Sequence, residues 1–131
     1  MISTKGRYAL RIMIDLAENS DKGYISLKDI AERQEISKKY LEGIAKRLVE
    51  NGLLIGASGR SGGYKLAKAP EKYTVAEILL SADETLSSVA CLADKNYKCT
   101  RRKKCKTLPL WKEFDEIVYD FFKEKKLSDL L

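Results

Sequence analysis

The first half of the chain carries apolar residues at helical spacing in three successive segments. In residues 5–18, "KGRYALRIMIDLAE", apolar positions recur every three or four residues, which predicts an amphipathic helix. The next two segments each follow a serine, Ser26 and Ser37, and serine is a typical helix N-cap. Two helices joined by a connection as short as "QEI" are typical of a helix-turn-helix. The second of these helices should end at "NG" (51–52), and its expected buried side comprises Tyr40, Leu41, Ile44, Ala45 and Leu48.

From Leu53 the pattern changes to two short runs typical of strands. The runs "LLIGA" and "YKLAK" are separated by "SGRSGG" (58–63), whose glycines permit positive backbone angles. Gly62 and Gly63 are also compatible with a phosphate-cradling loop, but the Lys-Ser/Thr ending of a P-loop is missing. The favoured prediction is a β-hairpin, which after a helix-turn-helix is a wing.

The second half opens with a capping box and closes with a strongly apolar helix. "TVAE" (74–77) predicts a short helix that continues through Leu80, and Pro109 suits the first turn of the last helix. The apolar surface of that last helix is broad, so one face is expected to cover its own chain and the other to meet a second copy. The alternative is a monomer whose core absorbs both faces. The near-heptad residues are Trp111, Phe114, Val118 and Phe121, flanked by Leu110, Ile117 and Phe122.

These elements predict a mainly α fold with a small β-hairpin. We expect a winged helix-turn-helix followed by a long C-terminal dimerisation helix. Residues 1–72 would form the DNA-binding domain, and residues 73–107 a short helix with a cysteine-containing sensor loop. Residues 108–131 would form the dimerisation helix and C-terminal tail.

The charge of the chain favours a polyanionic partner. Lys and Arg number 25 against 19 Asp and Glu, a formal charge of +6, and the excess lies mainly in residues 1–72, with a local run at 95–106. No apolar run approaches the roughly 20 residues that span a bilayer. We therefore expect a cytoplasmic protein that meets nucleic acid and no membrane.

The predicted helix-turn-helix indicates which side chains face DNA. The second helix of such a motif lies in the major groove with its first residues toward the bases. A carboxylate there, Glu42, is repelled by phosphate and is tolerated best where it accepts from a cytosine amino group. Arg60 at the wing tip would suit a narrow minor groove, and a solvated helix face is the competing interpretation of all these charges. The further candidates are Ser37, Lys38 and Lys39 on the helix, and Lys5 and Arg7 for phosphate contact.

All three cysteines lie in one charged loop. Cys91, Cys99 and Cys105 are separated by seven and five residues, and neither spacing is the CxxC of a zinc knuckle. Three thiolates within one loop can wrap an iron-sulfur cluster or a zinc ion. Nearby cations favour thiolate over thiol, which helps a metal ligand and a redox-reactive thiol alike. A solvated loop with inert cysteines is the third interpretation.

The motifs together resemble the winged-helix regulators of the IscR, NsrR and CymR type over nearly the whole chain. The resemblance rests on "STKGRYALRIMIDLA", "SLKDIAERQEISKKYLEGIAKRLVENGLL", "GGYKLAKAP" and "TVAEILLSADE", followed by the three cysteines and a tryptophan-containing helix. It implies a homodimer on a partly palindromic double-stranded DNA operator, with a wing from Ser58 to Tyr64. It places Ser37, Lys39, Tyr40 and Glu42 on the recognition helix.

The resemblance also implies a cofactor. In cluster-binding members of the family the three loop cysteines ligate a [2Fe-2S] or [4Fe-4S] cluster, and this carries over to Cys91, Cys99 and Cys105.

Two positions depart from the family pattern. Members often carry arginine just before the first wing glycine, where this chain has Ser58, and its arginine follows at Arg60. The IscR-type histidine, three residues after the third cysteine, is Leu108 here, and the chain has no histidine. A cluster held by three cysteines and one histidine is therefore excluded, which leaves a carboxylate such as Asp94, a small molecule or an open iron site.

The sequence thus predicts a dimeric, sequence-specific transcriptional regulator whose operator affinity is controlled by an iron-sulfur cluster. The main alternative is a cluster-free, CymR-like repressor controlled by a regulatory protein partner or by thiol oxidation. A thiol redox enzyme is disfavoured because the chain lacks CxxC and a histidine base, so no enzymatic activity is expected. A protein-interaction module that uses the winged helix without DNA is the remaining alternative.

Overall fold

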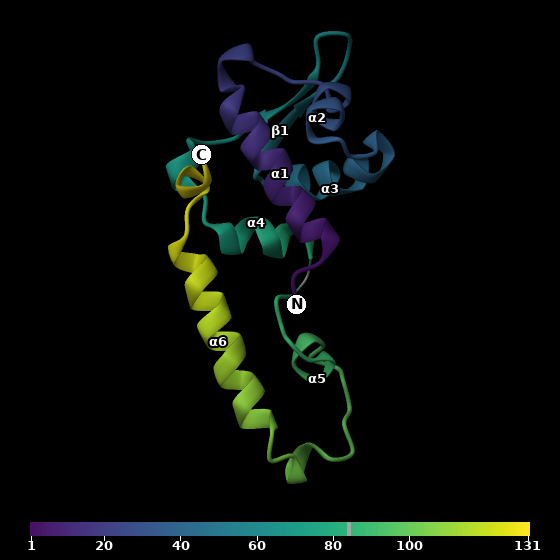
Figure 1. The fold of residues 1–131 in the computed structure, drawn as a ribbon. Helices are drawn as coiled ribbons and strands as arrows, with labels where there is room; N and C mark the ends of the chain where they lie inside the picture. The colour runs from purple at the N-terminus through teal and green to yellow at the C-terminus, as the bar shows by residue number, and fades with distance from the viewer. Residues whose placement is uncertain (84) are drawn as a thin grey trace.

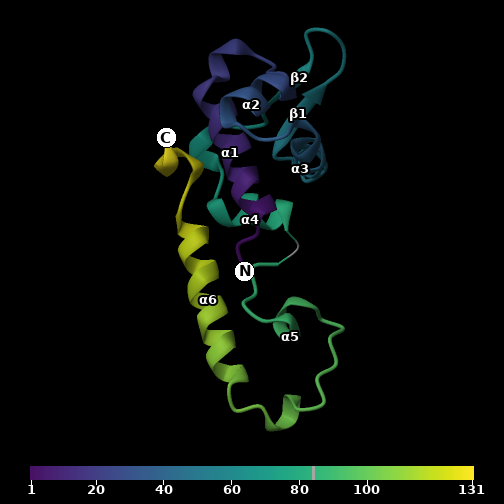
Figure 2. The same cartoon turned by 45° about the vertical axis from the view of Figure 1, so that its right-hand side comes forward.

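The computed structural model describes residues 1–83 and 85–131. A helical head with a β-hairpin lies at one end of the molecule, α6 extends away from it, and the cysteine-containing loop lies at the far end (Figures 1 and 2). No helix of the described residues is long and apolar enough to cross a membrane. The helices are α1 (Thr4–Glu18), α2 (Leu27–Gln34), α3 (Lys38–Glu50), α4 (Val75–Ala82), α5 (Ala90–Ala93) and α6 (Leu108–Glu124), and the strands are β1 (Leu54–Ala57) and β2 (Gly63–Leu66).

The helix-turn-helix forms where its capping serines predict it. Ser26 Oγ accepts from the amide of Asp29 at 3.1 Å, and Ser37 Oγ accepts from the amide of Tyr40 at 3.4 Å. Between the two helices, Glu35 adopts a left-handed conformation with φ of 55°. This residue turns the chain sharply enough for α3 to start within three residues of the end of α2.

The core of the head is built from one face of each of its four longer helices. α1 and α3 each contact the other three of these helices through apolar side chains, and the contact of α1 with α4 is the most extensive. The largest fully buried aliphatic side chains are Ile12, Met13, Leu16, Ile30, Leu41, Leu48, Ile78 and Leu79.

One residue expected in this core lies outside it. Tyr40 keeps 40% of its surface exposed, and its ring packs edge-on against Tyr8 of α1 at a centroid distance of 5.4 Å. The prediction that Tyr40 is buried was therefore wrong, because it sits at the start of α3, where the helix emerges beside α1.

An ion pair between the buried Asp15 and the exposed Arg33 ties α1 to α2. Asp15 is 1% exposed and accepts hydrogen bonds from Arg33 at 2.7 and 3.0 Å and from Gln34 at 3.1 Å. The bond to Asp15 raises the pKa of Arg33. Because removing one partner would leave the other charge uncompensated, this pair fixes how α2 sits on α1.

The wing is an antiparallel hairpin that also pairs with the chain entering α2. Leu54 lies opposite Leu66, while Tyr64 and Ile25 exchange two backbone hydrogen bonds of 2.8 and 2.9 Å. Gly63 has φ of 144°, and a Cβ there would lie 2.2 Å from the Ile25 carbonyl oxygen. The glycine is thus required by this close backbone approach, which confirms the hairpin interpretation of "SGRSGG".

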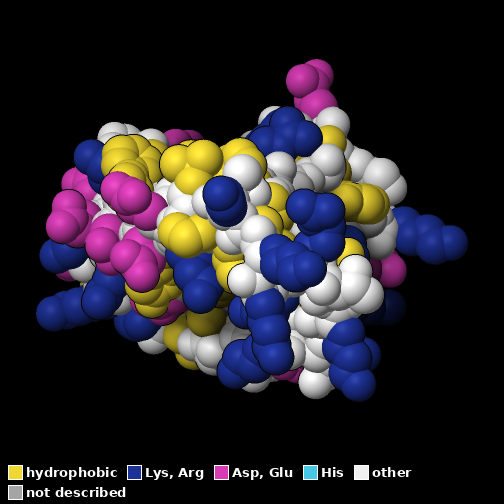
Figure 3. All heavy atoms as spheres, turned by 90° about the horizontal axis from the view of Figure 1, so that it is seen from below, with side chains coloured by type: hydrophobic (Ala, Val, Ile, Leu, Met, Phe, Trp, Pro, Cys, Tyr) yellow, Lys and Arg dark blue, Asp and Glu magenta, His cyan; other side chains and the backbone are white. Residues whose placement is uncertain are grey.

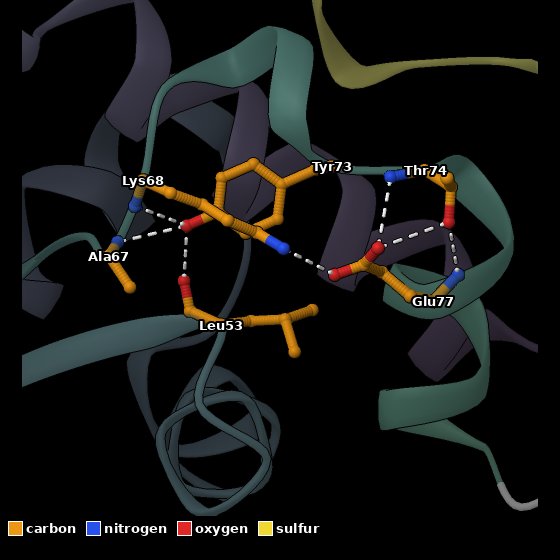
Figure 4. Close-up of polar contacts among 6 residues, drawn as sticks. All are labelled: Leu53, Ala67, Lys68, Tyr73, Thr74 and Glu77. Atoms are coloured by element: carbon orange, nitrogen blue, oxygen red, sulfur yellow. Dashed lines mark hydrogen bonds and ion pairs between the residues drawn. The ribbon is translucent and has the colours of Figure 1, made fainter.

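Tyr73 joins the base of the wing to α4 (Figure 4). Its hydroxyl donates to the Leu53 carbonyl at 2.7 Å and accepts from the amides of Ala67 and Lys68 at 2.9 and 3.1 Å. The next residue, Thr74, caps α4 through the predicted capping box with Glu77.

The C-terminal tail returns to the head. The Val75 amide donates to the Lys125 carbonyl at 2.8 Å, and the Leu127 amide donates to the Tyr73 carbonyl at 3.1 Å. Leu127 is completely buried. The tail is therefore part of the core of the head, a role that the sequence did not indicate.

α6 carries two apolar faces. Trp111 and Val118 are half-buried, and Phe122 packs against a small apolar cluster formed with α4. The near-heptad set predicted from the sequence is divided between these faces, because Phe114 and Phe121 belong to the outer one. The outer stripe consists of Leu110 (56% exposed), Phe114 (40%), Ile117 (62%) and Phe121 (54%).

The substitution Tyr73→Phe tests how much the tyrosine hydroxyl contributes to the stability of the fold. We expect the free energy of unfolding to fall by about 1–3 kcal/mol, because the Leu53 carbonyl loses its 2.7 Å bond and the amides of Ala67 and Lys68 lose their bonds to the hydroxyl. Urea unfolding followed by circular dichroism measures this change. The control Tyr97→Phe removes a hydroxyl from an exposed side chain and should leave the midpoint unchanged; equal effects of the two substitutions would contradict the assignment.

Candidate DNA-binding surface and cysteine loop

The first turns of α3 present a polar, exposed face. Ser37 is the N-cap, and Lys38, Lys39, Tyr40 and Glu42 all lie on the surface. Since the remaining face of α3 is buried in the head, these side chains are the ones the helix can offer to a major groove.

A groove between α1 and α3 brings predicted DNA contacts from two elements together. It has a volume of about 320 Å³, and Lys5 of α1 lines it opposite Lys39 and Tyr40. Arg47 contributes a third cation to the same groove. Arg7 is exposed on the first turn of α1, where its Nη2 donates to Thr4 Oγ1 at 3.1 Å.

A second groove, of about 580 Å³, separates α3 from the wing. Glu42 and Ser58 both line it, so the structure brings these two predicted residues to one site. Lys46 and Tyr64 also line it, and sequence analysis did not select Lys46. The sequence could have indicated Lys46, because it lies one helical turn after Glu42 on the same face of the predicted helix.

The wing tip is open to solvent. Ser58 and Arg60 are exposed on either side of Gly59, which has φ of 97°. A Cβ at Gly62 would lie 2.3 Å from the Ala57 carbonyl oxygen, so the tip can close only with glycine there. Arg60 thus extends beyond the paired strands. If α3 entered a major groove of DNA, this side chain could reach the neighbouring minor groove.

The cysteine loop is ordered into two short helical turns. Cys91 lies on α5, Cys105 follows the 3-10 turn Arg102–Lys104, and all three cysteines are free and half-exposed. Arg102 links the two arms of the loop by donating to the Cys91 carbonyl at 3.3 Å. The Asp94 carboxylate accepts from the Asn96 amide at 2.8 Å.

Within the described residues, no group of three or more Cys, Asp, Glu or His side chains is arranged to hold a metal. The three thiols are of the kind that iron-sulfur clusters take, but they are not gathered in this conformation.

The thiol of Cys105 is held in hydrogen bonds that favour its ionised form. The Thr107 hydroxyl lies 3.3 Å from its Sγ, and this hydrogen bond, with further ones from the backbone of Thr107 and Leu108, lowers the pKa of Cys105. A thiol with a lowered pKa is more often a thiolate at neutral pH, and the thiolate is both the nucleophile and the metal ligand.

The end of α4, which precedes this loop in the chain, is bonded to both α1 and α3. The Ser81 carbonyl accepts from Arg47 Nε of α3 at 3.1 Å, and the Asp83 carboxylate accepts from Ser3, the N-cap of α1. Gly6 of α1 packs directly against Leu79, where a Cβ would come within 3.2 Å of the leucine side chain. The chain that leaves this turn leads into the cysteine loop.

The helix-turn-helix, the wing and the basic groove between α1 and α3 define a winged-helix DNA-binding transcriptional regulator. The chain belongs to the Rrf2 family, whose model, described as an iron-dependent transcriptional regulator, matches residues 2–131. It is 36% identical over 130 residues to the HTH-type transcriptional regulator IscR of Erwinia tasmaniensis, covering 99% of this chain and 78% of that protein. Both the predicted family and the expectation of a regulator that is not an enzyme are confirmed.

Solved structures agree with the fold. CymR (YrzC), the global cysteine regulator of B. subtilis, superposes with a TM-score of 0.77 at 33% identity, covering 99% of this chain and 95% of that one. The oxidized form of Staphylococcus aureus CymR gives a TM-score of 0.73 at 32% identity, covering 99% and 94%. The predicted winged-helix fold class is confirmed.

The substitution Thr107→Val tests the activation of Cys105. Loss of the hydroxyl should raise the pKa of Cys105 toward the usual value of about 8.5 and shift its alkylation to higher pH. Mass spectrometry of metal-free protein treated with iodoacetamide over a pH series measures this, with Cys99 as an internal reference. The control Thr100→Val should leave the profile of Cys105 unchanged, and an unshifted profile in Thr107→Val would refute the role of the hydroxyl.

Proposed function

We propose that this regulator is a dimer whose operator affinity is controlled by an iron-sulfur cluster on Cys91, Cys99 and Cys105. The observation that carries the proposal is the confinement of every cysteine to one loop that follows directly on the last turn of α4, the turn bonded to both α1 and α3. The iron-dependent description of the family and the IscR relatives support it.

In the proposed complex each head reads one half-site. Lys38, Lys39 and Tyr40 enter the major groove. Glu42 accepts a hydrogen bond from a cytosine amino group and so restricts the DNA sequences that the head binds. The contacts to the phosphate backbone and the minor groove come from Lys5, Arg7, Ser37, Ser58 and Arg60.

The outer stripe of α6 is the proposed dimer interface. Leu110, Phe114, Ile117 and Phe121 follow i, i+4, i+7, i+11 spacing and thus form one continuous apolar face. A face of this kind is rarely left in water, and a second copy of the same helix is complementary to it. The two-fold symmetry of such a dimer matches that of a palindromic operator.

The proposed control acts through the change in shape of the cysteine loop. A cluster requires three thiols to converge, so binding must draw Cys91, Cys99 and Cys105 together and reorder the loop between α4 and α6. The cluster would supply a centre that reacts with oxygen or nitric oxide. Its presence on the protein would also depend on the supply of clusters. Because Ser81 and Asp83 hold α3 and α1, a shift of the chain that follows them changes how the head is set relative to α6, and with it the operator affinity.

Direct thiol control is the second candidate. The lowered pKa of Cys105 and its half-exposed position suit reaction with an oxidant, and the oxidized CymR structure is of a similar protein. In this version the loop changes shape when Cys105 is oxidised, and no cluster is needed.

The two candidates are separated by the absorption spectrum of protein purified without oxygen, with iron and sulfide measured per chain. The cluster proposal predicts visible bands with matching iron and sulfide, and a loss of both when the three cysteines are replaced by alanine. Operator binding of the reconstituted protein should differ from that of metal-free protein, and the Cys99→Ala variant should fold and dimerise but lose this difference.

A colourless protein that resists reconstitution would overturn the cluster proposal. If peroxide then changes operator binding of the wild type but not of Cys105→Ser, direct thiol control replaces it.

The substitution Ile117→Glu tests the interface. A charge in the middle of the apolar stripe should convert the dimer to a monomer, which sedimentation velocity measures directly. The control Lys112→Glu places the same side chain on roughly the opposite side of α6 and should leave the dimer intact. An unchanged sedimentation coefficient for Ile117→Glu would show that the copies meet elsewhere.

A further inference from the structure

The basic run on the cysteine loop, residues 101–106, has no acidic partner among residues 1–83 and 85–131. Arg101, Arg102, Lys103, Lys104 and Lys106 are all exposed. Neither of the two ion pairs found in the described part of the chain involves them. Within the described part of the chain, the cationic side chains of the run make one hydrogen bond, from Arg102 to the Cys91 carbonyl. Five closely spaced cations that repel one another call for an external polyanion.

The run lies far from the DNA-facing surface of its own head. α6 has 17 residues, so it is roughly 25 Å long, and the loop sits at the end opposite the head (Figures 1 and 2). Seen from the loop end, Lys and Arg side chains gather over one part of the molecule and Asp and Glu over another, with apolar side chains between them (Figure 3). The run therefore lies away from the surface that α3 and the wing of the same subunit present to solvent.

The proposed dimer changes this geometry. If two α6 helices pack along the outer stripe in parallel, the two basic runs lie side by side and repel each other. If they pack antiparallel, the runs lie at opposite ends, and each comes next to the head of the other subunit. Antiparallel packing also places the two heads at opposite ends of the α6 pair, as the binding of two separate half-sites requires.

We infer that the basic run of each subunit binds the phosphate backbone of the DNA beside the half-site held by the other subunit. The ligand is duplex phosphate, read without regard to sequence, and the contact is made in trans. The inference rests on the proposed dimer. Since the run belongs to the cysteine loop, this contact would also place the DNA and the proposed sensor in direct linkage.

The test compares Lys103→Gln/Lys104→Gln with the matched control Lys22→Gln/Lys72→Gln, which removes two exposed lysines from the head. The probe is a mixed-sequence duplex of about 40 base pairs, roughly four helical turns, with metal-free protein under reducing conditions. Fluorescence anisotropy at salt concentrations from about 50 to about 200 mM gives the slope of log affinity against log salt. The loop variant should lose about 0.9 of slope for each phosphate contact removed, and the control should keep the wild-type slope.

Repeating the measurement in the Ile117→Glu background separates the inference from the dimer it rests on. In a monomer the run cannot reach a partner's DNA, so the loop substitutions should no longer change the slope. Equal slopes for the loop variant and its control in an intact dimer would overturn the inference. A loop variant that weakens the dimer while leaving the slope unchanged would overturn it as well, by showing that the run pairs with acidic side chains of the partner. If Ile117→Glu remains a dimer, the interface proposal fails separately.

Discussion

The molecule depends on one buried phenol. The Tyr73 hydroxyl satisfies the carbonyl that precedes β1 and two amides that follow β2, so it closes the base of the wing. Its backbone carbonyl holds Leu127, which brings the end of the chain back into the head. The wing, the start of α4 and the C-terminal tail therefore meet at one residue. The tail follows the C-terminal end of α6, so this end of the helix is fixed to the head at the same residue.

This arrangement separates the reading of DNA from the sensing of a signal. The head is compact and its polar face is made by short local elements, while the cysteine loop is held away from it by α6. In the proposed function the two regions would communicate through the end of α4, which is bonded to Arg47 and Ser3. A signal that alters the loop would then act on α1 and α3 through these bonds. The proposed cluster and the proposed thiol reaction would both use that route.

The sequence predicted those parts of the structure that are set by local chemistry. Serine caps, the Thr74 capping box and the glycines of the wing each act within a few residues, and each formed where it was expected. What could not be predicted depends on distant partners. Which side of α6 faces its own chain is decided by where α4 lies, and Leu127 is buried because of a backbone pairing too short to leave a periodic pattern.

The site shows the same division. The exposed side chains of α3 followed from helix geometry, whereas the exposure of Tyr40 depends on its contact with Tyr8. The arrangement of the cysteines could not be predicted, because a loop rich in like charges has neither an apolar periodicity nor a core to fix it.

The pairing of Ile25 with Tyr64 has a mechanical consequence. The two backbone hydrogen bonds make the wing a continuation of the chain that enters α2, and Gly63 allows the strands to approach so closely that no hinge remains between them. The wing and the chain that enters α2 are thus held together as one unit. In the proposed dimer, regulation would then rotate or translate whole heads and change the span between half-sites, with the wing keeping its place on its own head.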